Sequence, residues 1–461
     1  MIQLDLKDSS TFANNTDDSH KKNYDRAATS CIIAVDELQR QFSEGKVKLL
    51  SLSHYYVHKD IECPIWYKIE NTITKHGKAI PNETIFYSSH YIGYCNIKDV
   101  SITIRPRFGE ELQNYLLNFA CNLYIPKGNS GYKSTQNHNP GFLLIALLWK
   151  AMLEKAIRVG QIPKQYIEDS KQISTFRGHL NIAKHIKTSL INASKFFCTY
   201  RKLTLNNIIN QTIRYTFSIL TSQKSEISSA IIRINEYDKK LAMFDVSNSP
   251  VKISDIDKIR YTKLNYAYKP VMSFSRAIIA HHEAVQNPNL SNAEFAYFID
   301  MAEIWELYLL KLLQQNLSNE YYIYSPNARY GDYLLKNGYR EIRPDIMIEK
   351  DNHVVMIIDA KYKNYKEFGQ NSKYGVCRED LYQMSTYLYR YGKENDSIVG
   401  LFVSPVYNSK ENDIHSFEHN PKHRIGLLNL NLEKGNTNIE DLKGEEENFI
   451  KNIKNILGST K

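Results

Sequence analysis

Two apolar runs joined by a short polar connection constrain the fold of this chain more than any other stretch. Residues 346–348 form the first run, and residues 354–358, which are rich in β-branched side chains, form the second. Runs of this length and composition are typical of strands. Because a short polar connection over residues 350–353 joins them, the two strands are predicted to pair as an antiparallel hairpin.

Charged side chains lie at the end of this hairpin away from the turn. Antiparallel pairing about a turn at residues 351–352 sets Asp345 opposite Ile358, one residue from Asp359, and strand twist can bring the two carboxylates near one cation. Asp359 and Lys361 share a strand face because side chains alternate along a strand. Two hard oxygen ligands suit Mg²⁺, or Mn²⁺ in its place. The ammonium could lower the pKa of an attacking water, orient it, or offset charge developing on phosphorus.

Taken alone, Asp-x-Lys at a strand end is more typical of an ordinary surface hairpin than of a catalytic site, because short motifs recur by chance. The Pro-Asp pair on the preceding strand favours a metal-dependent phosphodiesterase centre instead. The combination resembles the signature of the PD-(D/E)xK nucleases. In that resemblance, Asp345, Asp359 and Lys361 take the positions of the Asp, the second acid and the Lys.

The sequence after the hairpin extends this pattern. Residues 378–391 predict a helix with one apolar stripe that stops at Gly392 and sets Asp380 and Gln383 one turn apart. Residues 398–403 predict a buried strand, so that strand, helix and strand form a crossover. This order is that of a restriction-endonuclease-like core, and Gln383 is a further candidate for the site.

An amphipathic helix is also expected ahead of the hairpin, around residues 304–310. PD-(D/E)xK nucleases often place an acid from this helix at the metal. Glu306 is the candidate, because it lies beside Trp305 and Leu309 of the apolar stripe and so at the rim facing the core. Glu303, one turn earlier, is the alternative.

Several motifs together resemble the McrC family, the nuclease subunits of the McrBC restriction systems. They are the Asp-Met and Trp-Glu pairs of the first helix, the Arg-Pro-Asp strand, Asp-Ala-Lys-Tyr-Lys, and Asp-Leu-Tyr-Gln-Met. The resemblance extends upstream to Arg105-Pro106-Arg107 after a predicted strand, and to the central segment Phe176-Arg177-Gly178-His179-Leu180, in which His179 replaces the second Arg of the family motif. It covers about residues 85–405.

The resemblance implies a Mg²⁺-dependent endodeoxyribonuclease subunit of a modification-dependent restriction complex for antiviral defence. Its implied partners are modified double-stranded DNA and a McrB-like AAA+ subunit that hydrolyses GTP or ATP. The chain itself has no Walker A motif. Arg105, Arg107 and Arg177 are candidate contacts to the partner or to DNA. A non-catalytic adaptor that activates an AAA+ motor, and a stand-alone DNA-repair nuclease, remain as alternatives.

Length and composition predict a multidomain α+β protein. The chain has 461 residues, 42% of them hydrophobic, which is enough for more than one core. The predicted elements divide it into a polar N-terminal segment (1–30), a β-rich docking domain (31–140), a mainly helical region (141–295), and a restriction-endonuclease-like α/β domain with a C-terminal helix (296–461).

Charge and cysteine usage agree with a DNA-binding protein of a reducing compartment. The net charge of +9 favours a polyanionic partner. The six cysteines are scattered without a Cys-x-x-Cys pair, so they are expected to be reduced thiols. The polar start does not resemble a signal peptide, and no stretch is apolar enough to cross a bilayer. We therefore expect a cytoplasmic protein without membrane contact.

Overall fold

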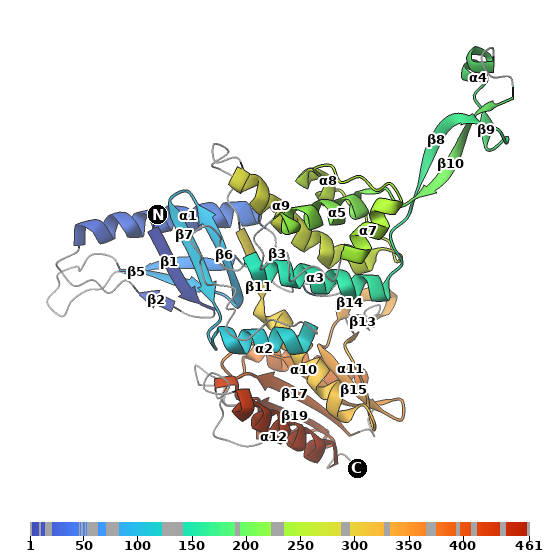
Figure 1. Cartoon of the computed structure of the whole chain (residues 1–461). Helices are drawn as coiled ribbons and strands as arrows, with labels where there is room; N and C mark the ends of the chain where they lie inside the picture. The colour runs from blue at the N-terminus through green and yellow to red at the C-terminus, as the bar shows by residue number, and fades with distance from the viewer. Residues whose placement is uncertain are drawn as a thin grey trace. The chain divides into compact units, whose positions relative to one another are not determined.

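The computed structural model forms two compact units, one made of Met1–Gly141 with Leu290–Lys461 and the other of Phe142–Asn289. Figure 1 shows the elements of each unit. The structure describes residues 2–8, 11–13, 21–45, 47, 49–50, 52, 63–70, 83–121, 142–189, 194–222, 235–286, 296–326, 332–365, 375–392, 397–406, 413–433 and 439–458.

The first unit contains a five-stranded sheet built from distant parts of the chain. In spatial order its strands are β1 (Ile2–Lys7), β7 (Val100–Arg105), β6 (Tyr91–Ile97), β11 (Ala296–Asp300) and β3 (Leu49–Leu50). β1 runs parallel to β7, and β6 pairs antiparallel with both β7 and β11. The polar N-terminal segment thus begins with a strand, and residues 296–300 complete this sheet.

Helix α1 (Lys21–Ser43) buries Val35 and Leu38 against this sheet, in one core with Ile102 and Phe298. A smaller antiparallel sheet lies in the same unit and contains β2 (Thr11–Ala13), β5 (Glu83–Ser88) and β4 (Ile65–Glu70). The strand predicted just before Arg105 is confirmed as β7.

A six-stranded mixed sheet also belongs to the first unit. In spatial order its strands are β12 (Tyr322–Tyr324), β15 (Ile346–Lys350), β16 (His353–Ala360), β17 (Ile398–Ser404), β19 (His423–Asn429) and β18 (Asp413–Ser416). β16, β17 and β19 are parallel to one another, whereas β12, β15 and β18 pair antiparallel with their neighbours. The predicted succession of strand β16, helix α11 (Arg378–Tyr391) and parallel strand β17 is confirmed.

Further helices and a small hairpin belong to this unit. They are α2 (Glu110–Cys121), α10 (Met301–Leu317), α12 (Ile439–Gly458), the hairpin of β13 (Asp332–Leu335) and β14 (Tyr339–Ile342), and the 3₁₀ turn η4 (Lys336–Gly338) between them. The predicted C-terminal helix is confirmed as α12. Its buried Glu446 accepts hydrogen bonds from Tyr115 of α2, at 2.8 Å, and from Tyr308 of α10, so α12 ties these two helices together.

The hairpin of β15 and β16 has a register that the sequence did not reveal. Its turn residues Asp351 and Asn352 both have positive φ, as two-residue hairpin turns require. Lys350 pairs with His353 and Glu349 with Val354, but Ile348 pairs with Met356, so Val355 is an extra residue that forms a β-bulge. Ile346 consequently pairs with Ile358. The predicted pairing of Asp345 with Ile358 is wrong by one residue, because continuing the observed register sets Asp345 opposite Asp359.

The second unit is a bundle of helices from which a β-arm projects (Figure 1). The helices are α3 (Phe142–Val159), α5 (Ile208–Thr221), α7 (Asn235–Met243), α8 (Ile253–Asp257), the 3₁₀ turn η2 (Tyr266–Tyr268) and α9 (Lys269–Gln286). The fully buried Trp149 of α3 donates a hydrogen bond to Ser275 of α9 at 2.8 Å, which fixes the pairing of these helices.

The β-arm leaves the bundle between α3 and α5. It consists of β8 (Gln165–Ile173), β9 (His179–Leu180), α4 (Ile182–Ser189) and β10 (Phe196–Thr204), with β10 paired antiparallel to both β8 and β9. Most of its residues are exposed or half-buried. The part of the chain that the structure describes includes no helix both long and apolar enough to span a bilayer.

Candidate active site

Asp345 and Asp359 lie at the end of the β15–β16 hairpin and are almost completely buried, with 5% and 1% of their surface exposed. The Asp345 carboxylate accepts the backbone N–H of Ala360 at 2.9 Å, which holds it beside β16. Burying two carboxylates together is unfavourable unless cations or donors compensate them. The register shift caused by the bulge therefore creates a site that requires positive charge.

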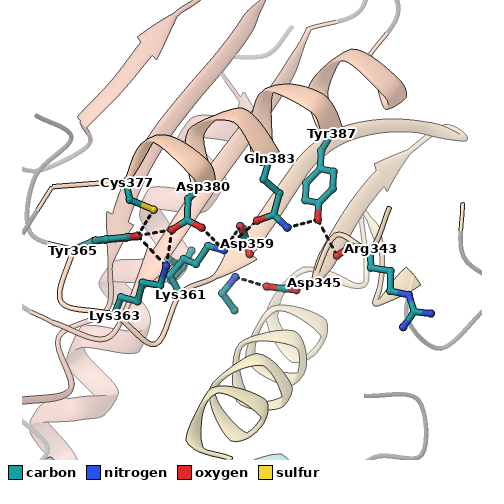
Figure 2. A network of polar contacts seen from close by, with 12 residues as sticks. Arg343, Asp345, Asp359, Lys361, Lys363, Tyr365, Cys377, Asp380, Gln383 and Tyr387 are labelled. Carbon is teal, nitrogen blue, oxygen red and sulfur yellow. Dashed lines mark hydrogen bonds and ion pairs between the residues drawn. The ribbon is translucent and has the colours of Figure 1, made fainter. Parts of the chain in front are cut away.

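Lys361 supplies one such charge. Its ammonium lies 2.8 Å from Asp359, 3.1 Å from Asp380 and 3.3 Å from the side-chain oxygen of Gln383 (Figure 2). Asp359, Lys361 and Gln383, which the sequence predicted as one site, are thus brought together. Asp345 joins them through Ala360, the residue between Asp359 and Lys361.

The ionisation of the lysine and of Asp380 is fixed by their mutual contact. Burial by itself would lower the pKa of Lys361, but the carboxylates of Asp359, Asp380 and Asp345 outweigh burial and raise that pKa well above its usual value. Burial would raise the pKa of Asp380, but Lys361, a hydrogen bond from Tyr365 and the nearby Lys363 lower it well below its usual range. The contact between Lys361 and Asp380 therefore favours the charged form of each group near neutral pH.

Asp380 is the centre of a second set of contacts that the sequence analysis missed. Its carboxylate accepts from Lys363 at 3.0 Å and from the hydroxyl of Tyr365, which also contacts the Cys377 sulfur at 3.3 Å (Figure 2). The available signal was the alternation of Lys361 and Lys363, which puts two ammonium groups on one face of the segment. One turn of helix α11 separates Asp380 from Gln383, so both reach that face.

Gln383 is itself held by a chain of hydrogen bonds. Its side-chain amide donates to the hydroxyl of Tyr387 at 2.8 Å, and that hydroxyl donates to the carbonyl of Arg343 at 3.2 Å. Arg343 lies two residues before Asp345. Helix α11 is thereby joined to both sides of the hairpin end.

A glycine permits helix α11 to lie close to the sheet. A Cβ at Gly400 of β17 would come within 2.5 Å of the sulfur of Met384, which is fully buried. Any larger residue would displace the Met384 side chain, through which helix α11 packs on β17. Gly400 thus permits the close approach of Met384 in the helix that carries Asp380 and Gln383.

The two glutamates of α10 have different surroundings. Glu303 is fully buried, and both of its oxygens accept the backbone N–H of Leu52, at 3.0 and 2.9 Å. Glu306 is also buried. Its neighbour Trp305 donates to the carbonyl of Val403 at 3.2 Å, and the backbone N–H of Lys361 donates to the same carbonyl at 2.9 Å. Helix α10 therefore contacts the strand end that carries the site, whereas Glu303 binds the segment near β3.

The donor set suits a hard divalent cation. Among the described residues there is no group of three or more His, Cys, Asp or Glu side chains arranged to hold a metal ion. Mg²⁺ is commonly bound by one or two carboxylates, with waters and substrate phosphates completing its shell. The buried pair of Asp345 and Asp359 fits that pattern and would be compensated by such an ion.

The three arginines predicted as contacts occupy different settings. Arg105 is half exposed and lies 3.7 Å from Glu110. Arg177 stacks on the ring of Tyr200 at 4.8 Å within the β-arm. Arg107 instead contacts Phe108, Tyr362 and Asn364 of this chain.

The chain is similar to components of McrBC restriction systems. Residues 87–403 match the family model described as McrBC 5-methylcytosine restriction system component. No curated protein matches the chain. Among solved structures, a chain in the refined half-complex from a tetradecameric assembly of Thermococcus gammatolerans McrB AAA+ hexamers with bound McrC is 16% identical. The alignment covers 98% of this chain and 100% of that one, with a TM-score of 0.49.

A chain in the cryo-EM structure of the Thermococcus gammatolerans McrBC complex is 15% identical, and its alignment covers 68% of this chain and 88% of that one, with a TM-score of 0.35. The family match spans well over half of the chain and includes the hairpin, Lys361 and helix α11. The chain therefore belongs to the family of McrBC 5-methylcytosine restriction system components.

Proposed function

We propose that this chain is the McrC-type nuclease subunit of its restriction complex, a metal-dependent endodeoxyribonuclease with a restriction-endonuclease-like domain. The observation that carries the proposal is the burial of Asp345 and Asp359 beside Lys361 at one strand end. A non-catalytic adaptor would gain nothing from two buried carboxylates, whose desolvation opposes folding. That cost is accounted for if the carboxylates serve a metal.

Asp345 and Asp359 would hold the metal. Glu306 of α10, predicted as a further ligand, is buried but does not form a three-acid group with them among the described residues. The ion would supply Lewis-acid charge that stabilises the negative charge developing on the phosphate in the transition state. Mg²⁺ is the expected ion, and Mn²⁺ should substitute for it.

Lys361 and Gln383 would act on the DNA side of the site. The ammonium of Lys361 is permanently charged, so its role is to orient the attacking water or to offset charge on phosphorus. Gln383, held by Tyr387, keeps the ammonium in place and can accept a hydrogen bond from the water. Asp380, which also pairs with Lys363, would hold the Lys361 ammonium in position at the strand end.

The partner in this proposal is a McrB-like AAA+ subunit that hydrolyses GTP or ATP and selects modified double-stranded DNA. Two surfaces would contact it, the exposed Arg105 after β7 and the β-arm around Arg177. The β-arm exposes apolar side chains on a polar chain, namely Tyr166, Ile167, Phe176, Ile182, Ile186, Phe196 and Leu203. Such a surface is typical of a protein interface.

A plasmid cleavage assay tests the proposal. The purified chain would be incubated with methylated and unmethylated plasmid and Mg²⁺, with and without a co-encoded AAA+ protein and GTP or ATP. We expect cleavage of the modified plasmid when metal, nucleotide and partner are all present. Efficient cleavage by the chain alone would favour a stand-alone nuclease, and partner stimulation without any cleavage would favour an adaptor.

A further inference from the structure

The segment that follows Asp359 uses its two faces differently. Lys361 and Lys363 point to Asp380 on helix α11. The intervening Tyr362 and the following Asn364 instead contact Arg107, which lies after strand β7 in the N-terminal sheet. One short segment thus connects the candidate site with a distant part of the same compact unit.

The Arg107 guanidinium is enclosed by this chain. It lies 4.3 Å from the ring centre of Tyr362 and 4.7 Å from that of Phe108, and its Nη1 donates to the side-chain oxygen of Asn364 at 3.0 Å. The rings of Phe108 and Tyr362 are both buried and meet edge to face at 6.2 Å. A cation between two buried rings gains more attraction than one at an exposed ring.

Asp8 anchors Arg107 from the N-terminal sheet. The Asp8 side chain is fully buried and accepts the backbone N–H of Arg107, and its own backbone N–H donates to the carbonyl of Arg105 at 2.8 Å. Burial raises the pKa of Asp8, and the Arg107 charge opposes that rise. The position of Arg107 is therefore set by the parallel pairing of β1 with β7, outside the six-stranded sheet.

The backbone of the segment is fixed from its other side. Lys361 donates to the carbonyl of Val403 at 2.9 Å, the Ser404 hydroxyl donates to the carbonyl of Lys363 at 2.5 Å, and Asn429 donates to the carbonyl of Tyr365 at 2.7 Å. These bonds hold the N–H of Lys361 and the carbonyls of Lys363 and Tyr365, whereas the side chains of Tyr362 and Asn364 contact Arg107.

We propose that Arg107 is a positioning residue for the nuclease site. Arg107 holds Tyr362 and Asn364 on one face of the segment, and thereby sets where Lys361 and Lys363 project from the other face. The inference rests on the nuclease function proposed above. It gives Arg107 an internal role in place of a contact to DNA or to the partner. It also joins the N-terminal sheet, where Arg105 is exposed, to the site.

Kinetics of the assembled complex test this role. Arg107→Ala should lower kcat for plasmid cleavage about 10- to 100-fold, because a shift of about 1 Å in a catalytic group has an effect of that size. KM should stay within about threefold, since DNA does not touch Arg107. Arg107→Lys should recover most of the loss, because its ammonium can also stack on the rings and donate to Asn364. Arg158→Ala is the control, since that exposed arginine of α3 contacts a carbonyl of its own helix.

Hydrogen–deuterium exchange of the full chain gives a readout that does not depend on activity. In Arg107→Ala, the amides of residues 361–365 should exchange faster than in the wild type by about fivefold or more, and those of strand β19 should not change. Asn364→Ala should produce the same pattern. The double variant should exchange little faster than Arg107→Ala, because both substitutions remove the same Arg107–Asn364 hydrogen bond.

The outcomes separate the two proposals. Wild-type exchange rates and wild-type kcat in Arg107→Ala would overturn the positioning role. If the wild-type complex with metal and nucleotide cleaves no DNA, the nuclease proposal fails, and the exchange data still decide whether Arg107 holds the segment. Should Arg107→Ala fail to fold, Arg107→Lys and Asn364→Ala supply the same comparison at smaller perturbation.

Discussion

The β15–β16 hairpin and the β-arm depart from ordinary protein surfaces in opposite directions. The β15–β16 hairpin buries Asp345 and Asp359, which are charged side chains that water would solvate better. The β-arm exposes apolar side chains, with Tyr166 68% and Phe176 58% exposed, where water would favour their burial.

Burying two carboxylates and exposing apolar side chains both make folding less favourable. A bound cation would offset this free-energy cost at Asp345 and Asp359, and a bound protein partner would offset it at the β-arm. A buried pair of like charges thus indicates a candidate catalytic site, whereas an exposed group of apolar side chains indicates a candidate docking surface. Substitutions in the β15–β16 hairpin, in the helices beside it and in the β-arm should show whether the two regions have these separate roles.

The largest effect is expected at the charged end of the β15–β16 hairpin. Asp345→Asn keeps the size of the side chain and an acceptor for Ala360 but removes the charge, so plasmid cleavage should fall by about 10³-fold or more. Binding of the AAA+ partner, followed by gel filtration, should be unchanged. Asp441→Asn, at an exposed site of α12, is the matched control. Normal cleavage by Asp345→Asn would show that the buried charge of Asp345 is not needed for cleavage, and the β15–β16 hairpin would then lose its proposed catalytic role.

The two glutamates of α10 should show which acid joins the site. Glu306→Gln should lower cleavage by about 10²-fold, because it removes a buried charge from the helix whose Trp305 contacts the strand end. Glu303→Gln should cleave normally and lower the free energy of unfolding by about 1 kcal/mol, because it weakens a charged acceptor of the Leu52 N–H. Urea denaturation and initial rates measure the two quantities. The reverse pattern would assign the metal to Glu303.

Loss of the Asp380 charge should have a smaller effect on cleavage. Asp380→Asn should lower kcat about 30-fold, because Lys361 and Lys363 lose their shared anion. The folded-state pKa of Asp380 lies below its unfolded value, so its ionisation stabilises the protein above about pH 4 and this contribution is lost as the pH falls through the folded value. The difference in unfolding free energy between wild type and variant should therefore shrink below about pH 4. A constant difference would show that the contact is not ionic.

The smallest effect is expected at the apolar surface of the β-arm. Phe176→Asp should weaken binding of the AAA+ partner about tenfold, as is usual for one apolar interface residue, and leave the melting temperature unchanged. Met243→Asp is the control, because Met243 is even more exposed but lies on α7 of the bundle. Calorimetric titration of the partner measures both. Equal affinities for Phe176→Asp and wild type would exclude this part of the arm from the interface.

Sequence patterns were sufficient where the chain interacts locally. The hairpin, the helix of residues 378–391 and its stop at Gly392, and the buried strand after it were all predicted and are confirmed, because turn residues and apolar periodicity act over a few residues. The grouping of Asp359, Lys361 and Gln383 followed from the same local reasoning.

Long-range packing could not be read in the same way. Nothing near Glu303 indicates that its carboxylate binds Leu52, about 250 residues away in the chain. Nothing near Arg107 indicates its contact with Tyr362. The contacts of Asp380 with Lys361 and Lys363 also depend on the packing of helix α11 against β17, where Met384 lies on Gly400. These contacts depend on which elements become neighbours, and periodicity does not determine that.

The bulge at Val355 makes the site sensitive to chain length as well as to composition. A relative with one further residue inserted between the turn and the Asp359 equivalent, and no second bulge to absorb it, would retain every letter of the Pro-Asp and Asp-x-Lys motifs, and a motif search would score it the same. Its Asp345 equivalent, however, would face an apolar residue, and the two acids would no longer be paired across the strands. Within such a family, a one-residue insertion in this strand would separate the two acids without changing either motif, and counting residues from the turn would expose it.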